Sequence, residues 1–137
     1  PTSSARRSVS EPDGNAPRER AWVFYVDDMI RFAEAVRTYT AGLDLPGFQH
    51  DRRTYDATLR NLELIGEAAS RVPPPIRDGA DAIPWRQLVA TRNRLIHGYL
   101  GIDDDTIWSI VRDDVPDLLH ALRVLRADIG VPPAGGA

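Results

Sequence analysis

The chain has 137 residues, of which 42% are hydrophobic, and it carries a net charge of -3. This length favours one domain, and the hydrophobic fraction is sufficient for a buried core. A negative net charge does not favour binding of nucleic acid by the overall charge of the protein. Any phosphate-binding site must therefore come from a local cluster of cations. No apolar run approaches the roughly 18 residues that span a membrane, and no signal peptide is visible. The absence of cysteine excludes disulfides and thiolate metal sites, and it fits the reducing cytoplasm in which we place the protein.

Two tails are predicted to flank one helical domain. Residues 1–17 are rich in Ser, Pro and Gly and lack hydrophobic periodicity, which predicts a disordered N-terminal tail. Residues 130–137 predict a second disordered tail, because Gly and Pro-Pro stop a helix. The domain itself is therefore expected over residues 18–129.

The first half of this domain predicts two long helices. Apolar side chains recur at three- and four-residue steps over residues 20–40 and again over residues 51–71. Asp51 is a predicted N-cap of the second helix, and the proline run at 73–75 ends that helix. A connector with one short turn is expected between the two helices.

The second half predicts two more helices. The third opens at Pro84, where a missing N–H costs nothing, and ends near Gly98. The fourth begins at Asp103 and continues to about Ile129, with a kink expected at Pro116. Strand-like alternation is absent, so the expected fold is an all-α, up-down four-helix bundle.

The end of the third helix carries the most chemistry in the chain. With an advance of about 100° per residue, Arg92 falls on the same stripe as Leu88 and Ile96, which should face other helices. Asn93 and His97 are four residues apart and lie side by side on one edge. A cation on an apolar face, followed by a histidine at the end of the helix, marks this stretch as the candidate site.

A purely structural interpretation of the same residues also stands. A buried helical arginine is often paired with a carboxylate, and Glu63 or Glu67 on the second helix could orient Arg92. A histidine in a last helical turn can simply satisfy free carbonyl groups and the negative end of the helix dipole.

The stretch resembles the signature of the HEPN superfamily, in which an arginine and a polar residue precede a histidine. It is more similar to the HepT toxin branch, where the pattern extends to Arg-x4-His-x-Tyr, here Arg92, His97 and Tyr99 with Asn93 as the polar residue. Four longer stretches are also similar to HepT sequences in order and spacing, and the resemblance extends over about residues 20–127. They are YVDDMIRFAEAVRTYTAGLD, DRRTYDATLRNLELIGEAASRVP, IPWRQLVATRNRLIHGYLGIDDDTIW and VRDDVPDLLHAL.

This resemblance implies a metal-independent endoribonuclease that acts as the toxin of a toxin–antitoxin pair. It implies a two-fold homodimer with the motifs meeting at the interface, and neither a metal nor another cofactor. It also implies an MntA-like nucleotidyltransferase antitoxin as partner, which transfers AMP from ATP onto the motif tyrosine, here Tyr99.

The residue chemistry agrees with RNA cleavage. A metal-free reaction needs a base, an acid and a cation for the phosphorane, and His97 and Arg92 have suitable chemistry. His50 and His120 lie elsewhere in the chain, so a second motif histidine would have to come from a second copy. Two other functions stay open: a non-catalytic RNA- or nucleotide-binding module, and an inhibitory subunit of a nucleotidyltransferase.

Three further groups of residues have two interpretations each. The aspartates 103–105 are predicted to cap a helix and not to bind metal, because consecutive helical side chains diverge. Trp85 and Trp108 fit the core better than a base-stacking role. Four arginines could extend a basic strip for RNA or could be ordinary surface residues: Arg52, Arg53, Arg60 and Arg71.

Overall fold

The computed structural model describes the backbone of residues 2–98 and 102–128, and within these ranges the side chains from Ala21 onward. This part of the chain is built from helices without strands, which confirms the all-α fold. Its elements are α1 (Thr2–Thr40), α2 (Leu45–His50), α3 (Arg52–Ser70), α4 (Pro74–Asp78), α5 (Trp85–Ile96), α6 (Asp104–Ser109), a π-helical turn η1 (Ile110–Asp114) and α7 (Val115–Asp128).

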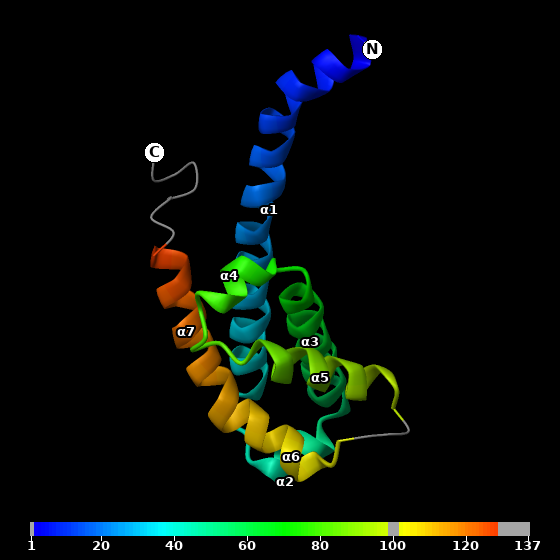
Figure 1. The fold of residues 1–137 in the computed structure, drawn as a ribbon. Helices are drawn as coiled ribbons and strands as arrows, with labels where there is room; N and C mark the ends of the chain where they lie inside the picture. The colour runs from blue at the N-terminus through cyan, green and yellow to red at the C-terminus, as the bar shows by residue number, and fades with distance from the viewer. Residues whose placement is uncertain (1, 99–101, 129–137) are drawn as a thin grey trace.

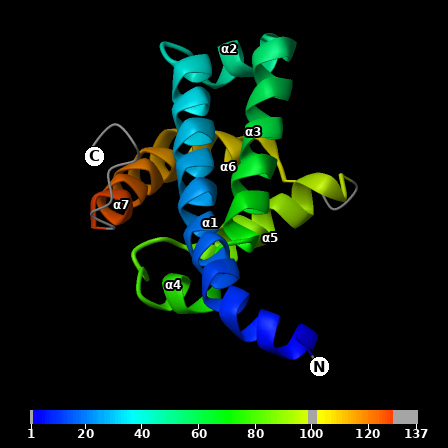
Figure 2. The same ribbon diagram turned by 90° about the horizontal axis from the view of Figure 1, so that it is seen from above.

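The long helices α1 and α3 lie side by side and form the centre of the fold (Figures 1 and 2). The helix α7 packs against α1, and α5 crosses α3. In both views the C-terminal end of α5 lies at the edge of the molecule, on the side away from α7. The C-terminal end of α5 therefore packs against other helices on only one of its sides in the described part of the chain.

The core contains the apolar side chains that the helical periodicity selected. Trp85 and Trp108 are both buried, which confirms their predicted core positions. Ile96, which was predicted to face other helices, is instead exposed at 51%. The side chains with less than 2% exposure include Val26, Met29, Val36, Phe48, Ile65, Val72, Ile107, Val115, Leu119 and Leu122.

Aspartates cap three of the helices, because a short carboxylate can accept a hydrogen bond from a free N–H in the first turn. The predicted caps at Asp51 and Asp103 are confirmed, and the short turn expected after Asp44 is α2. The bonds run from Gly47 N to Asp44 at 2.9 Å, from Thr54 N to Asp51 at 3.2 Å and from Thr106 N to Asp103 at 2.7 Å.

The start of the first helix differs from the expectation. The helix was predicted from about Arg20, whereas α1 begins at Thr2. A helix that is already stabilised by packing extends without a second nucleation step, which allows α1 to continue through a sequence of low helical propensity. The second predicted tail, residues 130–137, lies outside the described residues. Within the described ranges, no helix combines the length and apolar character that a membrane crossing requires.

The fourth predicted helix is divided by the π-helical turn η1. The N–H of Val115 donates to the carbonyl of Ile110, five residues back, just before Pro116. Pro116 has no N–H and its ring clashes with the carbonyl of Arg112, so a regular helix cannot run through this point. The predicted distortion at Pro116 is thus present as a π turn, a common way for a helix to absorb an irregularity.

Candidate active site

The site is built on a close crossing of α3 and α5 at Gly66. A Cβ atom added at Gly66 would lie 2.6 Å from the carbonyl oxygen of Leu88 and would collide with the Cβ atom of Arg92. A glycine inside a helix costs about 0.5–1 kcal/mol relative to alanine. Its presence in the middle of α3 is explained by this contact, because only glycine leaves room for the α5 backbone.

The crossing places Arg92 against α3, with 29% of its side chain exposed. The Nη2 atom of Arg92 donates to Oε1 of Glu67 at 2.5 Å, and its Nη1 atom donates to Oδ1 of Asn93 at 2.9 Å. The predicted pairing with Glu67 is therefore confirmed. Glu63, the other predicted partner, pairs with Arg60 on its own helix, at 3.3 Å.

Glu67 also pairs with a second arginine. Its Oε2 atom accepts a hydrogen bond from Nη2 of Arg71 at 2.9 Å. The hydrogen bond from Arg71 and the charge of Arg92 lower the pKa of Glu67 below its ordinary value. The carboxylate is therefore ionised at neutral pH. With two guanidinium groups around one carboxylate, the cluster keeps one net positive charge.

His97 lies at the C-terminal end of the same helix. It is the C-cap of α5, its backbone N–H donates to the carbonyl of Asn93 at 3.1 Å, and it is exposed. Gly98 follows with a φ of 45°, in the left-handed region that favours glycine, which confirms the predicted helix end. His97 is five positions after Arg92, which corresponds to a rise of about 7.5 Å along a helix axis. Tyr99, the predicted AMP acceptor, lies outside the described residues.

The arginines of the predicted basic strip are largely paired with carboxylates on their own helix. Such i,i+3 and i,i+4 pairs are ordinary features of an exposed helix surface and neutralise its charge. The contacts favour surface arginines over an extended RNA strip. They are Arg52–Asp56 at 3.4 Å, Arg60–Glu63 at 3.3 Å and Arg71–Glu67 at 2.9 Å.

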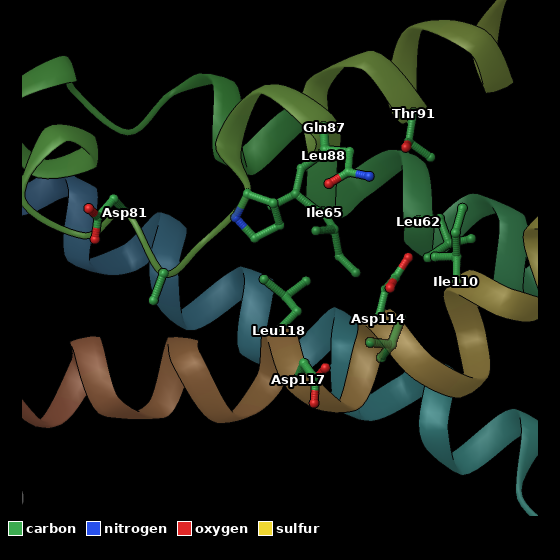
Figure 3. A pocket seen from close by; sticks show the side chains of 13 residues that line it. Leu62, Ile65, Asp81, Gln87, Leu88, Thr91, Ile110, Asp114, Asp117 and Leu118 are labelled. Carbon is green, nitrogen blue, oxygen red and sulfur yellow. The ribbon is translucent and has the colours of Figure 1, made fainter.

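A groove of about 280 Å³ separates α5 from η1 and α7 (Figure 3). Its lining contains neither Arg92 nor His97, and none of the described residues that form it is basic. Its lining includes apolar Leu62, Ile65 and Leu118 together with acidic Asp81, Asp114 and Asp117. Burial and the neighbouring aspartates raise the pKa of Asp114. An acidic groove disfavours phosphate, so it is a poor place for RNA or a nucleotide.

The aspartates at the start of α6 have structural partners. Asp103 is the N-cap, as predicted, and Asp104 accepts hydrogen bonds from the Tyr55 hydroxyl at 2.5 Å and from Gln49 at 3.0 Å. Among the described residues, no three histidine or acidic side chains gather closely enough to hold a metal ion. The candidate site itself contains arginine, asparagine, glutamate and histidine side chains.

A comparison with protein families identifies the family of this chain. The model of the family described as Ribonuclease HepT-like matches residues 29–125, which include Arg92, Asn93, His97 and the crossing at Gly66. The chain belongs to the HepT-like ribonuclease family. The expected resemblance to HepT proteins is thereby confirmed.

Several named proteins are similar in sequence to this HepT-like chain. It is 33% identical over 102 residues to "Probable ribonuclease HepT" of Thermococcus cleftensis, covering 74% of this chain and 93% of that protein. It is 33% identical over 101 residues to "Putative RNase MJ1380" of Methanocaldococcus jannaschii, covering 74% of this chain and 93% of that protein. A third relative, "Putative RNase TTE0752" of Caldanaerobacter subterraneus, is 29% identical over 94 residues, covering 69% of this chain and 84% of the relative. No solved structure matches.

Two residues of the candidate site were not identified from sequence. An isolated glycine within a helical pattern, such as Gly66, often marks a close contact with another element. The sequence did not show which helix makes that contact. Arg71 was considered only as a surface cation, and its bond to Glu67 is the familiar i,i+4 pair. What links it to the site is the second bond of Glu67, which comes from a different helix.

Proposed function

We propose that this chain is an endoribonuclease toxin that cleaves RNA without a metal ion. Membership in the HepT-like family and the names of its relatives support an RNase activity. The observation that carries the finer proposal is the arrangement of α5. Arg92 is fixed against Gly66 and Glu67, five residues before an exposed His97 at the end of the same helix.

The two side chains divide the reaction between them. Arg92 binds the non-bridging oxygens of the scissile phosphate and stabilises the charge that develops on the phosphorane. His97 accepts the proton of the ribose 2′-hydroxyl as that oxygen attacks phosphorus and the bond to the 5′-oxygen breaks. The leaving 5′-oxygen takes up a proton from a second acid.

A second copy of the chain would provide that acid. The chain has one motif histidine, and an isologous two-fold interface would bring two copies of it together. The one-sided packing of α5 supports this arrangement, as does Ile96, whose large apolar side chain is 51% exposed one residue before His97. We therefore place the RNA-cleaving site at a homodimer interface that includes the end of α5.

The experiment is cleavage of a single-stranded RNA by the purified protein in the presence of EDTA. We expect wild-type protein to cleave, and His97→Ala and Arg92→Ala each to reduce the rate by about 10²-fold or more, since each removes a group used in the transition state. The matched controls are His120→Ala on α7 and Arg86→Ala in the first turn of α5, both exposed in the fold.

The controls should keep the wild-type rate, and circular dichroism should show that all four variants are folded. Undiminished cleavage by folded His97→Ala protein would exclude the proposed site. Binding of RNA without cleavage by the wild type would favour a non-catalytic module. Growth arrest on expression of the chain alone would distinguish a toxin from an inhibitory subunit.

We also propose that an MntA-like nucleotidyltransferase neutralises the toxin by transferring AMP to Tyr99. The added phosphodiester would bring a negative charge close to the arginine that otherwise binds RNA phosphate. Co-expression with such a partner should increase the intact mass by one or more AMP units, and peptide mapping should locate them on Tyr99. AMP found only on another residue, such as Tyr39 or Tyr55, would reject the assignment.

A further inference from the structure

The contacts around Arg92 leave its guanidinium group in one orientation. Its side-chain stem lies against Gly66, Nη2 is bonded to Glu67, and Nη1 is bonded to Asn93. The Nε atom is buried, and it has no hydrogen-bond partner among the described residues. The rotation of the guanidinium plane is therefore determined by the two terminal nitrogens.

These two bonds do not use all the donors of the group. Each terminal nitrogen of an arginine carries two N–H groups, so one donor on Nη1 and one on Nη2 remain beyond the bonds to Asn93 and Glu67. Two such donors form the planar fork that matches two phosphate oxygens. The Arg92 side chain is 29% exposed, and the proposed function requires that these two donors face the bound phosphate.

Glu67 is itself held from the other side. Its Oε2 atom is bonded to Arg71 and its Oε1 atom to Arg92, so each carboxylate oxygen has its own arginine. Arg71 directly follows α3 as its C-cap, and Arg92 lies on α5, so Glu67 connects the end of α3 to α5. A simple ion pair would neutralise Arg92, whereas this cluster retains a positive charge for a phosphate.

We propose that Glu67 is a positioning residue of the ribonuclease site, which fixes the guanidinium of Arg92 for the scissile phosphate and is itself fixed by Arg71. This inference rests on the proposed ribonuclease function. Glu67 does not touch the reacting atoms; it acts through Arg92. Loss of its charge should therefore slow the chemical step more than it weakens RNA binding, because a displaced fork still attracts phosphate.

The test compares Glu67→Gln with the matched control Glu63→Gln. Both residues lie on α3, one turn apart, and both pair with an arginine, but the partner of Glu63 is on its own helix. We expect kcat to fall about tenfold to hundredfold for Glu67→Gln, with KM within about threefold of wild type, as for a misplaced catalytic group. Glu63→Gln should keep both constants.

A second measurement tests whether the guanidinium group of Arg92 is held in place, and it does not depend on RNA cleavage. In the ¹⁵N spectrum of the guanidinium groups, rotation of the Arg92 terminal nitrogens should be slow in wild-type protein and in Glu63→Gln. It should be fast in Glu67→Gln. Equal kinetic constants for the two variants, or equal Arg92 rotation in wild type and Glu67→Gln, would overturn the positioning role while leaving a ribonuclease activity intact.

The two proposals can fail separately. If wild-type protein does not cleave RNA, the proposed function is wrong, and the spectra alone decide whether Glu67 fixes Arg92. If Glu67→Gln does not fold, Glu67→Asp replaces it, since the shorter side chain keeps its charge but no longer reaches Arg92 at hydrogen-bond distance. A folded Glu67→Asp protein with the wild-type kcat would overturn the proposal.

Discussion

Tyr55 shows how one polar side chain can connect three helices. Its hydroxyl on α3 donates to Asp104 on α6, and Asp104 also accepts a hydrogen bond from Gln49 on α2. Burial and the adjacent carboxylate raise the pKa of Tyr55 to about 12. Phe48 packs on Tyr55 with 5.0 Å between the ring centroids, so the polar contact lies directly beside the core.

The variant Tyr55→Phe should lower the free energy of unfolding by about 1 kcal/mol at pH 7, the usual contribution of one hydrogen bond. Because the folded pKa of Tyr55 is above the unfolded value of about 10, this stabilisation is complete below pH 10. It is lost progressively as the pH rises toward 12. Urea unfolding of both proteins at a series of pH values measures the difference.

The control is Tyr39→Phe, since Tyr39 is exposed on α1. This variant should match the wild type at pH 7. A difference between wild type and Tyr55→Phe that does not shrink above pH 10 would contradict the proposed role of the hydroxyl proton.

At the scale of the elements, the crossing of α3 and α5 decides where Arg92 lies. The variant Gly66→Ala places a methyl group where the α5 backbone now lies, 2.6 Å from the carbonyl oxygen of Leu88. We expect it to lower the free energy of unfolding by roughly 1–3 kcal/mol, as overpacked sites do. We also expect it to reduce RNA cleavage, because α5 must move away from Glu67.

Gly79→Ala is a suitable control for this prediction. A Cβ atom at Gly79 would lie 3.7 Å from its nearest neighbour, which is an ordinary contact. Urea unfolding and the cleavage assay should therefore show little change. If Gly66→Ala were as stable and as active as Gly79→Ala, the close crossing would not be a requirement of the site.

The individual elements were largely predictable from the sequence. The caps at Asp51 and Asp103, the stop at Pro73 and the end of α5 at Gly98 all depend on local chemistry, and each was found where it was predicted. The form of the distortion before Pro116 was not predictable. A proline shows that a helix must be disturbed, but the surrounding packing decides whether the result is a kink or a π turn.

At the scale of the whole molecule, the proposed dimer makes a further prediction. Ile96→Asp should weaken self-association, because it places a charge on an exposed apolar side chain beside the motif histidine. We expect at least a tenfold increase in the dimer dissociation constant, equivalent to about 1.4 kcal/mol, and a matching loss of RNA cleavage at low protein concentration. Sedimentation equilibrium measures the first effect.

Val124→Asp provides the comparison for this variant. Val124 is 47% exposed on α7, close to the 51% of Ile96, so the same substitution is made on a similarly exposed aliphatic side chain. It should leave self-association unchanged. A monomeric wild-type protein that still cleaves RNA would contradict the shared site, and equal effects of both variants would place the interface elsewhere.

Features that depend on neighbouring residues along the chain could be predicted from the sequence alone. Helical periodicity, caps and breakers are local, so they identified an all-α fold and its main helices. The Arg-x4-His-x-Tyr spacing is also local, and it indicated both the family and the candidate residues, of which Tyr99 remains a sequence-based prediction.

The arrangement of residues around Arg92 depends on how the helices pack and could not be predicted in this way. The sequence offered Glu63 and Glu67 as equivalent partners, yet one carboxylate pairs along its own helix and the other reaches α5. The physical reason is the close approach at Gly66, since Glu67 is the residue next to the point where the two backbones meet. A helix crossing depends on the shapes of two surfaces far apart in the chain, and no local pattern specifies it.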